Sequence, residues 1–206
     1  GWHELLCHDS TGSVAARARV HVRPGRAVSC QLVAGTNLTG SALVAGQWVA
    51  FDMEASDACG NGLSEPVDLS TTGAHQVPTV VCSSCVPSHP PRVVQTSSGS
   101  WEVQLMPAIS GSHELHISIG PTAAVGSPFT VDVRPGLVQG RRCTVVGLDG
   151  TAPFLPSNFT IEARDAFGNR CLRGGHHFSI SIAPKGHGHY GKVEEIIDHD
   201  TGEYTV

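Results

Sequence analysis

A repeat with a period of about a hundred residues runs through this chain of 206 residues. The pentapeptide DACGN that begins at Asp57 returns as DAFGN at Asp165, and the hexapeptide VHVRPG that begins at Val20 returns as VDVRPG at Val131. Two further markers keep the same order: His3-Glu4-Leu5 returns as His113-Glu114-Leu115, and Gly99-Ser100-Trp101-Glu102-Val103 returns as Gly202-Glu203-Tyr204-Thr205-Val206. Solenoid repeats are roughly 20 to 50 residues long, so each repeat here has the size of a whole domain.

The markers divide the chain into three segments. Residues 1–25 are predicted to be the last two strands of a preceding repeat, residues 26–136 a complete repeat, and residues 137–206 an incomplete repeat that lacks its last two strands. A sandwich without two of its strands would expose its core and leave strand edges unpaired. We therefore expect the chain to be a segment of a longer array.

Composition and hydrophobic spacing favour β-structure. Only 15% of the residues are charged, against roughly 25% in an average soluble domain, and 24 Gly and 13 Pro separate short apolar runs that are typical of strands. The predicted strands are residues 29–33, 48–55, 79–82, 101–105, 113–119 and 129–133, and then 143–148, 159–163, 178–182, 193–197 and 204–206. The predicted fold is all-β, with tandem immunoglobulin-like antiparallel β-sandwiches.

Charge and motif content exclude several classes of function. The formal net charge is -5 and the sequence pI is about 6.2, so the chain has no basic field that would collect phosphates, and no nucleic-acid partner is predicted. No apolar run approaches the roughly 18 to 20 residues that span a bilayer, so no membrane insertion is predicted in this segment. Neither a phosphate-binding loop nor a nucleophile motif is found, which predicts a protein that is not an enzyme and has no cofactor.

The strand motifs resemble those of the filamin-type immunoglobulin-like repeat. In that family the second strand runs into a D-x-x-G-N turn, present here from Asp165, and the last strand carries G-S-P-F-x-V-x-V, present here from Gly126. The fifth strand's G-x-Y-x-V begins at Gly202, so the resemblance covers nearly the whole chain. Two departures stand out: Ser13-Val14-Ala15-Ala16 replaces Gly-Ser-Pro-Phe in the first segment, and the middle repeat is longer around residues 82–91.

The resemblance implies a role as a spacer and docking surface, in which an exposed edge between the third and fourth strands accepts a partner's strand by β-augmentation. Carried onto the third segment, this edge is formed by residues 178–182 facing residues 193–197. The side chains expected along it are Phe178, Ile180, Ile182, Val193 and Ile196. A buried sandwich face explains the same alternation without a partner, and that is the simpler interpretation.

Cys82 and Cys85, with His75 and His89 nearby, form half of a zinc-ligand pattern. A second cysteine pair at fixed spacing is missing, so no metal site is predicted, and a local disulfide or two thiols in a loop is favoured. The remaining clustered histidines lack an acidic or cysteine partner at fixed spacing and are expected to be solvated; they are His176, His177, His187 and His189.

Two further cysteine pairs recur with the repeat: Cys30 with Cys59, and Cys143 with Cys171. In each pair one cysteine lies near the start of the first strand and the other lies just past the second. Those ends meet in an antiparallel pair, so a disulfide that needs α-carbons within about 7 Å is reasonable in each repeat. The alternative is that they are unbridged, small buried apolar residues.

Asn37 and Asn158 begin N-glycosylation sequons, which would indicate a secretory route if they are used. The leading functional hypothesis is a structural scaffold in a cytoskeletal or ciliary assembly, which contacts other proteins through sandwich edges or faces and also contacts neighbouring repeats. The alternative is an extracellular or cell-surface adhesion protein. The paired cysteines and the sequons favour this alternative. A third hypothesis, a metal-dependent enzyme, rests only on Cys82, Cys85 and scattered histidines.

Overall fold

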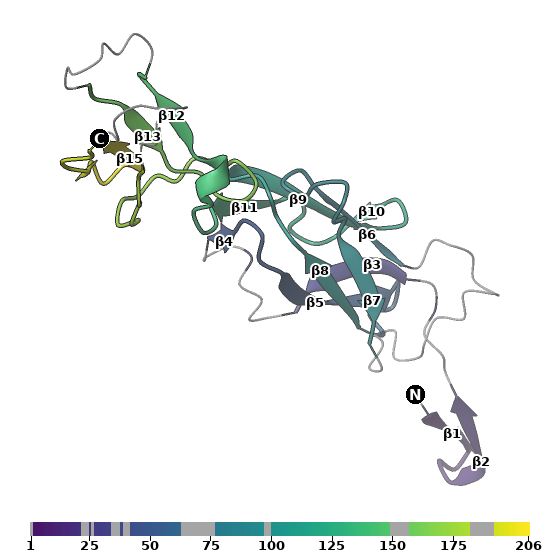
Figure 1. Ribbon diagram of the computed structural model, residues 1–206. Helices are drawn as coiled ribbons and strands as arrows, with labels where there is room; N and C mark the ends of the chain where they lie inside the picture. The colour runs from purple at the N-terminus through teal and green to yellow at the C-terminus, as the bar shows by residue number, and fades with distance from the viewer. Residues whose placement is uncertain are drawn as a thin grey trace.

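The structure of the chain, a computed structural model, is all-β, as predicted (Figure 1). It describes residues 2–21, 25, 27–33, 38, 42–62, 77–96, 100–148, 157–181 and 192–206. Within those residues the strands form four sheets, of which three are antiparallel throughout. The remaining sheet includes one parallel pair, between β11 (Phe129–Arg134) and β4 (Leu43–Val44).

The middle of the chain is a sandwich of two sheets. One sheet has the strand order β3-β5-β8-β7; its strands are β3 (Ala27–Leu32), β5 (Val49–Asp57), β8 (Trp101–Leu105) and β7 (Arg92–Gln95). The other has the order β10-β9-β11-β4, with β6 also paired to β9; the strands not yet given are β10 (Thr122–Ala123), β9 (Gly111–Ile119) and β6 (Pro78–Cys82).

The hydrophobic core lies between these two sheets. In β8 the buried residues Trp101, Val103 and Leu105 alternate with more exposed polar ones, and in β9 Leu115 and Ile117 are buried in the same alternating way. All five belong to one cluster of buried residues. Alternate side chains of a strand point to opposite faces of its sheet, so this pattern confirms the predicted immunoglobulin-like sandwich.

A separate two-stranded hairpin precedes the sandwich. Its strands are β1 (Trp2–His8) and β2 (Val14–His21). His3 lies opposite Val20 in this hairpin, just as His113 lies opposite Val131 between β9 and β11. The two hairpins therefore share their register as well as their sequence markers.

The last part of the chain repeats the first sheet of the sandwich. After the short 3-10 helix η1 come four strands in the order β12-β13-β15-β14; the bounds are η1 (Gly140–Arg142), β12 (Thr144–Val146), β13 (Thr160–Glu162), β15 (Glu203–Thr205) and β14 (Ile197–Asp198). This order matches β3-β5-β8-β7 strand for strand. Its buried cluster is small and contains Ile161, Ala163, Cys171 and Tyr204.

Two predicted strands of the last segment are wrong in their extent. Residues 178–181 are in no strand, and of residues 193–197 only Ile197 is in one. In the sandwich the corresponding strand β6 pairs with β9. Among the described residues after 136, no strand lies beside 178–181 as β9 lies beside β6, so these residues have no ladder to join.

Candidate functional site

The side chain of Asp57 ties together two distant parts of the chain. Asp57 ends β5 and opens a tight turn, residues 57–61, which we call the first aspartate turn. Its Oδ1 accepts the backbone N–H groups of Cys59 and Asn61, both at 2.9 Å, and its Oδ2 accepts the backbone N–H of Gly25 at 2.8 Å. The bond from Gly25, followed by the bonds from Asn61, lowers the pKa of Asp57 to about 2, because they stabilise the ionised carboxylate.

Asp165 repeats this arrangement in the second aspartate turn, residues 165–169. Its Oδ1 accepts the backbone N–H groups of Phe167 and Asn169 at 2.9 Å each, and its Oδ2 accepts that of Gly136 at 2.8 Å. Gly136 is closely packed, since a Cβ atom there would lie 2.6 Å from the carbonyl oxygen of Ala45. Each aspartate thus accepts a bond from a glycine that precedes the first strand of a sheet, Gly25 ahead of β3 and Gly136 ahead of β12.

Asn169 extends the second aspartate turn across to the preceding sandwich. Its Nδ2 donates to the carbonyl oxygen of Ala108 at 2.7 Å and to Asp165 Oδ2 at 2.8 Å, while its Oδ1 accepts the backbone N–H of Ser110 at 3.0 Å. Asn61, the corresponding residue of the first aspartate turn, is exposed and donates to both carboxylate oxygens of Asp57. Asn61 therefore bonds to the aspartate of its own turn, whereas Asn169 also joins its turn to the segment between β8 and β9.

Phe167 supplies an apolar contact beside this bridge. Its ring lies against Gly46, where a Cβ atom would be 2.7 Å from Phe167 Cε2. The backbone N–H of Gly46 also donates to the carbonyl oxygen of Pro107 at 2.8 Å, which fixes this loop against residues 106–110. We call Gly46, Ala108, Ser110, Phe167 and Asn169 the joint.

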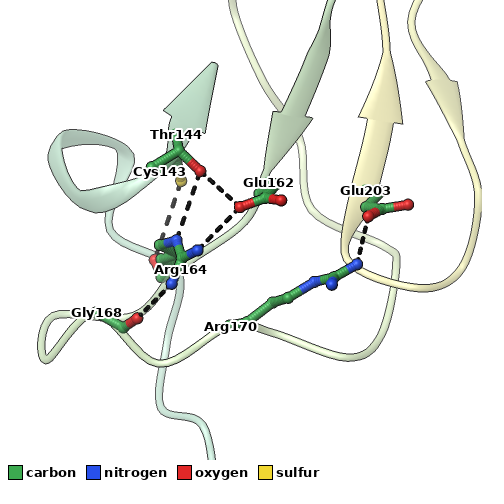
Figure 2. A network of polar contacts seen from close by, with 7 residues as sticks. All are labelled: Cys143, Thr144, Glu162, Arg164, Gly168, Arg170 and Glu203. Atoms are coloured by element: carbon green, nitrogen blue, oxygen red, sulfur yellow. Dashed lines mark hydrogen bonds and ion pairs between the residues drawn. The ribbon is translucent and has the colours of Figure 1, made fainter. Parts of the chain in front are cut away.

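A polar network links β12 and β13 to the second aspartate turn (Figure 2). Arg164 Nη2 lies 2.9 Å from Glu162 Oε2, and its Nη1 donates to the carbonyl oxygen of Gly168 at 2.9 Å. Thr144 Oγ1 donates to Glu162 Oε2 at 2.8 Å. The bond from Thr144, and then the bond from Arg164, lower the pKa of Glu162. Arg164 thereby links the sheet to the second aspartate turn.

Glu162 and Glu203 lie directly opposite one another on β13 and β15. Two carboxylates in that position repel. Each is paired with its own arginine, Glu162 with Arg164 and Glu203 with Arg170, and Figure 2 shows the two pairs side by side. The network therefore offsets a like-charge pair within the sheet.

The predicted partner-strand edge lies against the core of the last segment. Phe178, Ile180 and Ile196 are partly buried and pack on its buried cluster, and the ring centroids of Phe178 and Tyr204 are 4.8 Å apart. Val193 is also partly buried. Ile182 lies outside the described residues. The inward direction of these side chains is what a core role requires, and the use of this edge by a partner stays a prediction.

Tyr204 and His176 position the chain that leads into this edge. The hydroxyl oxygen of the buried Tyr204 accepts the backbone N–H of His176 at 3.0 Å and lies 2.8 Å from its ring Nδ1. Burial raises the pKa of the Tyr204 hydroxyl. The Tyr204 hydroxyl therefore holds His176 against the sheet.

Cys82 and Cys85 lie at the two ends of a tight turn, residues 82–85, which we call the dithiol turn. The backbone N–H of Cys85 donates to the carbonyl oxygen of Cys82 at 3.3 Å, and both side chains are partly buried at the edge of the sandwich core. Cys82 Sγ lies 3.0 Å from Ser84 Oγ. His89 is exposed at the end of a following turn, and His75 lies outside the described residues.

The other two cysteine pairs differ from one another. Cys30 is buried on β3 opposite Ala55, whereas Cys59 is exposed on the first aspartate turn. At about 3.3 Å per residue, Cys30 lies roughly 10 Å along β3 from the residue opposite Asp57, which begins the first aspartate turn.

Cys143 and Cys171 do share one cluster. Burial, and then the charges of Asp165 and Cys143, raise the pKa of Cys171. All seven cysteines of the chain lie in its described part, and all are unbridged. The predicted pairings stay predictions.

Asn158 is exposed in the segment just before β13, and Thr160, the third residue of its sequon, begins that strand. The first sequon, at Asn37, lies outside the described residues. The described ranges contain no group of three or more His, Cys, Asp or Glu side chains placed to hold a metal ion. They also contain no helix with the length and apolar character needed to cross a membrane.

Sequence reasoning missed the joint. The repeated pentapeptides indicated a turn, but the first and second aspartate turns carry the same asparagine, and within the described residues the asparagine of the second turn alone bonds to the segment between β8 and β9. The signal that could have revealed it is the change from Cys59 to the large apolar Phe167 at the same position of a tight turn.

Comparison with known proteins gives one family. The family model of the Filamin/ABP280 repeat matches residues 26–130. Among solved structures, FdeC, an Escherichia coli adhesin, is 15% identical with a TM-score of 0.47, covering 94% of this chain and 60% of its own. The Lin-41 filamin domain is 20% identical with a TM-score of 0.40, covering 55% of this chain and 98% of its own.

Invasin, a bacterial integrin-binding protein, is 14% identical with a TM-score of 0.47. The match covers 94% of this chain and 37% of invasin. This chain therefore spans less than two thirds of the length of both bacterial proteins.

Proposed function

The chain belongs to the filamin repeat family, and on that basis we propose that it is a non-enzymatic structural scaffold, a spacer and protein-docking module in a cytoskeletal or ciliary assembly. The observation that carries the proposal is the joint. A spacer must keep successive domains at a set distance, and Asn169 bonds to main-chain groups of Ala108 and Ser110 in the preceding sandwich. Main-chain partners make the bridge independent of side-chain rotamers on the other side.

The joint can be tested with a pair of matched variants. Asn169→Ala removes the bridge and the bond to Asp165, whereas Asn61→Ala removes only the corresponding bonds within the first aspartate turn. Residual dipolar couplings of the 206-residue chain report the relative orientation of the two sheets that flank the joint. We expect a loss of fixed orientation in Asn169→Ala and its retention in Asn61→Ala. Equal behaviour of the two variants would count against a rigid spacer.

We also propose the division of the chain into residues 1–25, 26–136 and 137–206. In its favour, the β1–β2 hairpin has the register of the β9–β11 hairpin, and β12-β13-β15-β14 has the order of β3-β5-β8-β7. The exposed apolar side chains of β1 and β2 fit a pair of strands that belongs to another sandwich, and they include Trp2, Leu5 and Leu6. Fusion of a preceding repeat to the hairpin would be expected to protect those residues from solvent.

Docking by strand addition is proposed at the predicted edge, residues 178–182 facing 193–197, of which residue 182 lies outside the described residues. Ser179 and Ser181 are exposed, while Phe178 and Ile180 face the core. A lysine at an exposed edge position blocks strand addition without disturbing the core. Ser179→Lys is therefore expected to weaken partner binding at unchanged stability, whereas Ile180→Lys lowers stability. Binding that survives Ser179→Lys would leave these residues with a core role alone.

An extracellular or cell-surface adhesion protein is the second candidate. The exposure of Asn158 ahead of β13 favours it, because an oligosaccharide is attached to an exposed asparagine. Mass spectrometry of the native protein, alkylated without reduction, would weigh the Asn158 and Asn37 peptides and map the two repeated cysteine pairs. Sugar together with bridged cysteines would select adhesion, and bare asparagines with free thiols would select the intracellular scaffold.

A further inference from the structure

The dithiol turn has a backbone suited to closing a bond between its two sulfur atoms. The 3.3 Å bond from the Cys85 N–H to the Cys82 carbonyl oxygen marks a four-residue turn, whose end α-carbons lie within about 7 Å. Disulfides need α-carbons about 4.4 to 6.8 Å apart. Both thiols remain partly accessible, and Ser83, between them, is exposed.

The two thiols are chemically distinct. The side-chain hydrogen bond from Cys85 lowers the pKa of Cys82, with further help from Ser84. The same bond, together with burial, raises the pKa of Cys85. Cys82 is thus favoured as the thiolate, and the thiolate is the nucleophile in thiol chemistry.

Ser84 connects the dithiol turn to the joint. It is fully buried, and its carbonyl oxygen accepts the backbone N–H groups of Ala108 at 2.7 Å and Ile109 at 3.1 Å. The carbonyl oxygen of the same Ala108 accepts the bond from Asn169. Ala108 therefore links the carbonyl group of Ser84, inside the dithiol turn, to Asn169 of the second aspartate turn.

We propose that Cys82 and Cys85 form a reversible thiol–disulfide exchange site for low-molecular-weight disulfides, and that its oxidation restrains residues 106–110 through Ser84. The Cys82 thiolate attacks one sulfur of the small disulfide, forming a mixed disulfide and releasing one small thiolate. Cys85 then loses its proton, and its sulfur attacks Cys82 Sγ and releases the second small thiolate. The protein dithiol is oxidised to a disulfide, and one small disulfide is reduced to two thiols.

Glutathione disulfide is the probe for the exchange chemistry. In the 206-residue chain at neutral pH, peptide mapping is expected to find a Cys82–Cys85 disulfide that excess glutathione reverses. Cys85→Ser is expected to stop at a mixed disulfide on Cys82. Cys82→Ser is expected to react several-fold more slowly than Cys85→Ser, since Cys85 is left with its burial, which disfavours the thiolate, whereas Cys82 keeps its contact with Ser84.

The exposed Cys59 serves as the reference thiol in the same samples. Circular dichroism verifies that both serine variants are folded. Equal rates for Cys82→Ser and Cys85→Ser, or a mixed disulfide that persists on Cys82 in the unsubstituted chain, would overturn the assignment of attacking and resolving cysteines.

Amide hydrogen exchange at Ala108 and Ile109 tests the link to the joint. Both N–H groups donate to the Ser84 carbonyl oxygen, so closing the dithiol turn is expected to slow their exchange by about fivefold or more, the lower end of usual coupling strengths. The Cys82→Ser/Cys85→Ser double variant, treated with the same oxidant, is the control. Unchanged or faster exchange in the oxidised chain would contradict the restraint.

Discussion

The ring of Phe167 lies so close to the backbone of Gly46 that a Cβ atom on this glycine would be 2.7 Å from Phe167 Cε2. Gly46 also has a φ of +82°, in the left-handed region that favours glycine. Two features therefore require glycine at position 46: the left-handed backbone angle and the contact with the Phe167 ring. Conformation and contact can be separated, because Gly60 has nearly the same angle without the ring.

Gly46→Ala is expected to destabilise the chain more than Gly60→Ala. Both variants bear the cost of a left-handed alanine, about 1 to 2 kcal/mol, and at Gly60 no atom of the described residues beyond the chain neighbours lies within 4 Å of the added carbon. At Gly46 the clash with Phe167 adds about 1 kcal/mol or more. Urea unfolding measures both free energies. Adding Phe167→Ala to Gly46→Ala should remove the excess, and an undiminished excess would show that the ring is not its source.

Acid is expected to weaken the first aspartate turn. The pKa of Asp57 lies at about 2, below its ordinary value of 3.8, so its stabilising contribution is fully present above about pH 4 and is lost as the pH falls toward 2. Asp57→Asn is therefore expected to lower the free energy of unfolding at pH 5 and to differ less from the unsubstituted chain near pH 2. A difference that stays constant over this range would contradict the role of the charge.

Tyr204→Phe is expected to cost about 1 kcal/mol of stability. The phenylalanine keeps the ring in the core, but the His176 N–H loses its acceptor, the hydroxyl oxygen 3.0 Å away. Hydrogen exchange at His176 should become faster, while exchange in β8 of the sandwich should not change. If His176 exchanges as slowly in the variant as before, the hydroxyl does not anchor this segment.

Arg164→Met is expected to destabilise the sheet around β13 by about 0.5 kcal/mol at low salt, because it leaves Glu162 facing Glu203 without its cation. Screening at 1 M salt should shrink the difference. Adding Glu203→Gln should recover part of the loss. Hydrogen exchange of the amides in β13 and β15 measures each change, and a loss that is insensitive to both salt and Glu203→Gln would exclude like-charge repulsion as its cause.

The sequence predicted the longer strands of the sandwich well, and hydrophobic alternation explains why. Residues 101–105 were predicted as a strand and form β8 with those bounds, and residues 129–133 lie within β11. Alternation works there because one face of each strand is buried in the core. By contrast β7, β4 and β10 are four residues long or shorter, too short for a period to show.

The last segment shows the limit of this reasoning. Phe178 and Ile180 alternate with exposed serines, as predicted for a strand, and their side chains do face the core. Alternation reports burial, however, and a strand also requires a neighbour with which to form hydrogen bonds. None of the described residues after 136 supplies that neighbour for residues 178–181.

For the candidate site too, the sequence predicts the repeated motifs but not the contacts between distant segments. The pentapeptides were found from sequence because they repeat, but the bridge from Asn169 to Ala108 spans 61 positions and uses a main-chain acceptor. Any residue in place of Ala108 would offer the same carbonyl oxygen, so no side-chain pattern in the sequence predicts the contact. Likewise, the spacing of Cys30 and Cys59 does not predict that Cys30 pairs with Ala55 in the register of β3 and β5.

The bond between Gly136 and Asp165 has a mechanical consequence. Gly136 precedes η1 and β12, and Asp165 lies just past the end of β13 that is paired with the beginning of β12. When an array of such domains is stretched, tension entering at Gly136 divides between the peptide leading into β12 and the carboxylate at the end of β13. β12 therefore cannot separate from β13 one hydrogen bond at a time until the bond between Gly136 and Asp165 breaks.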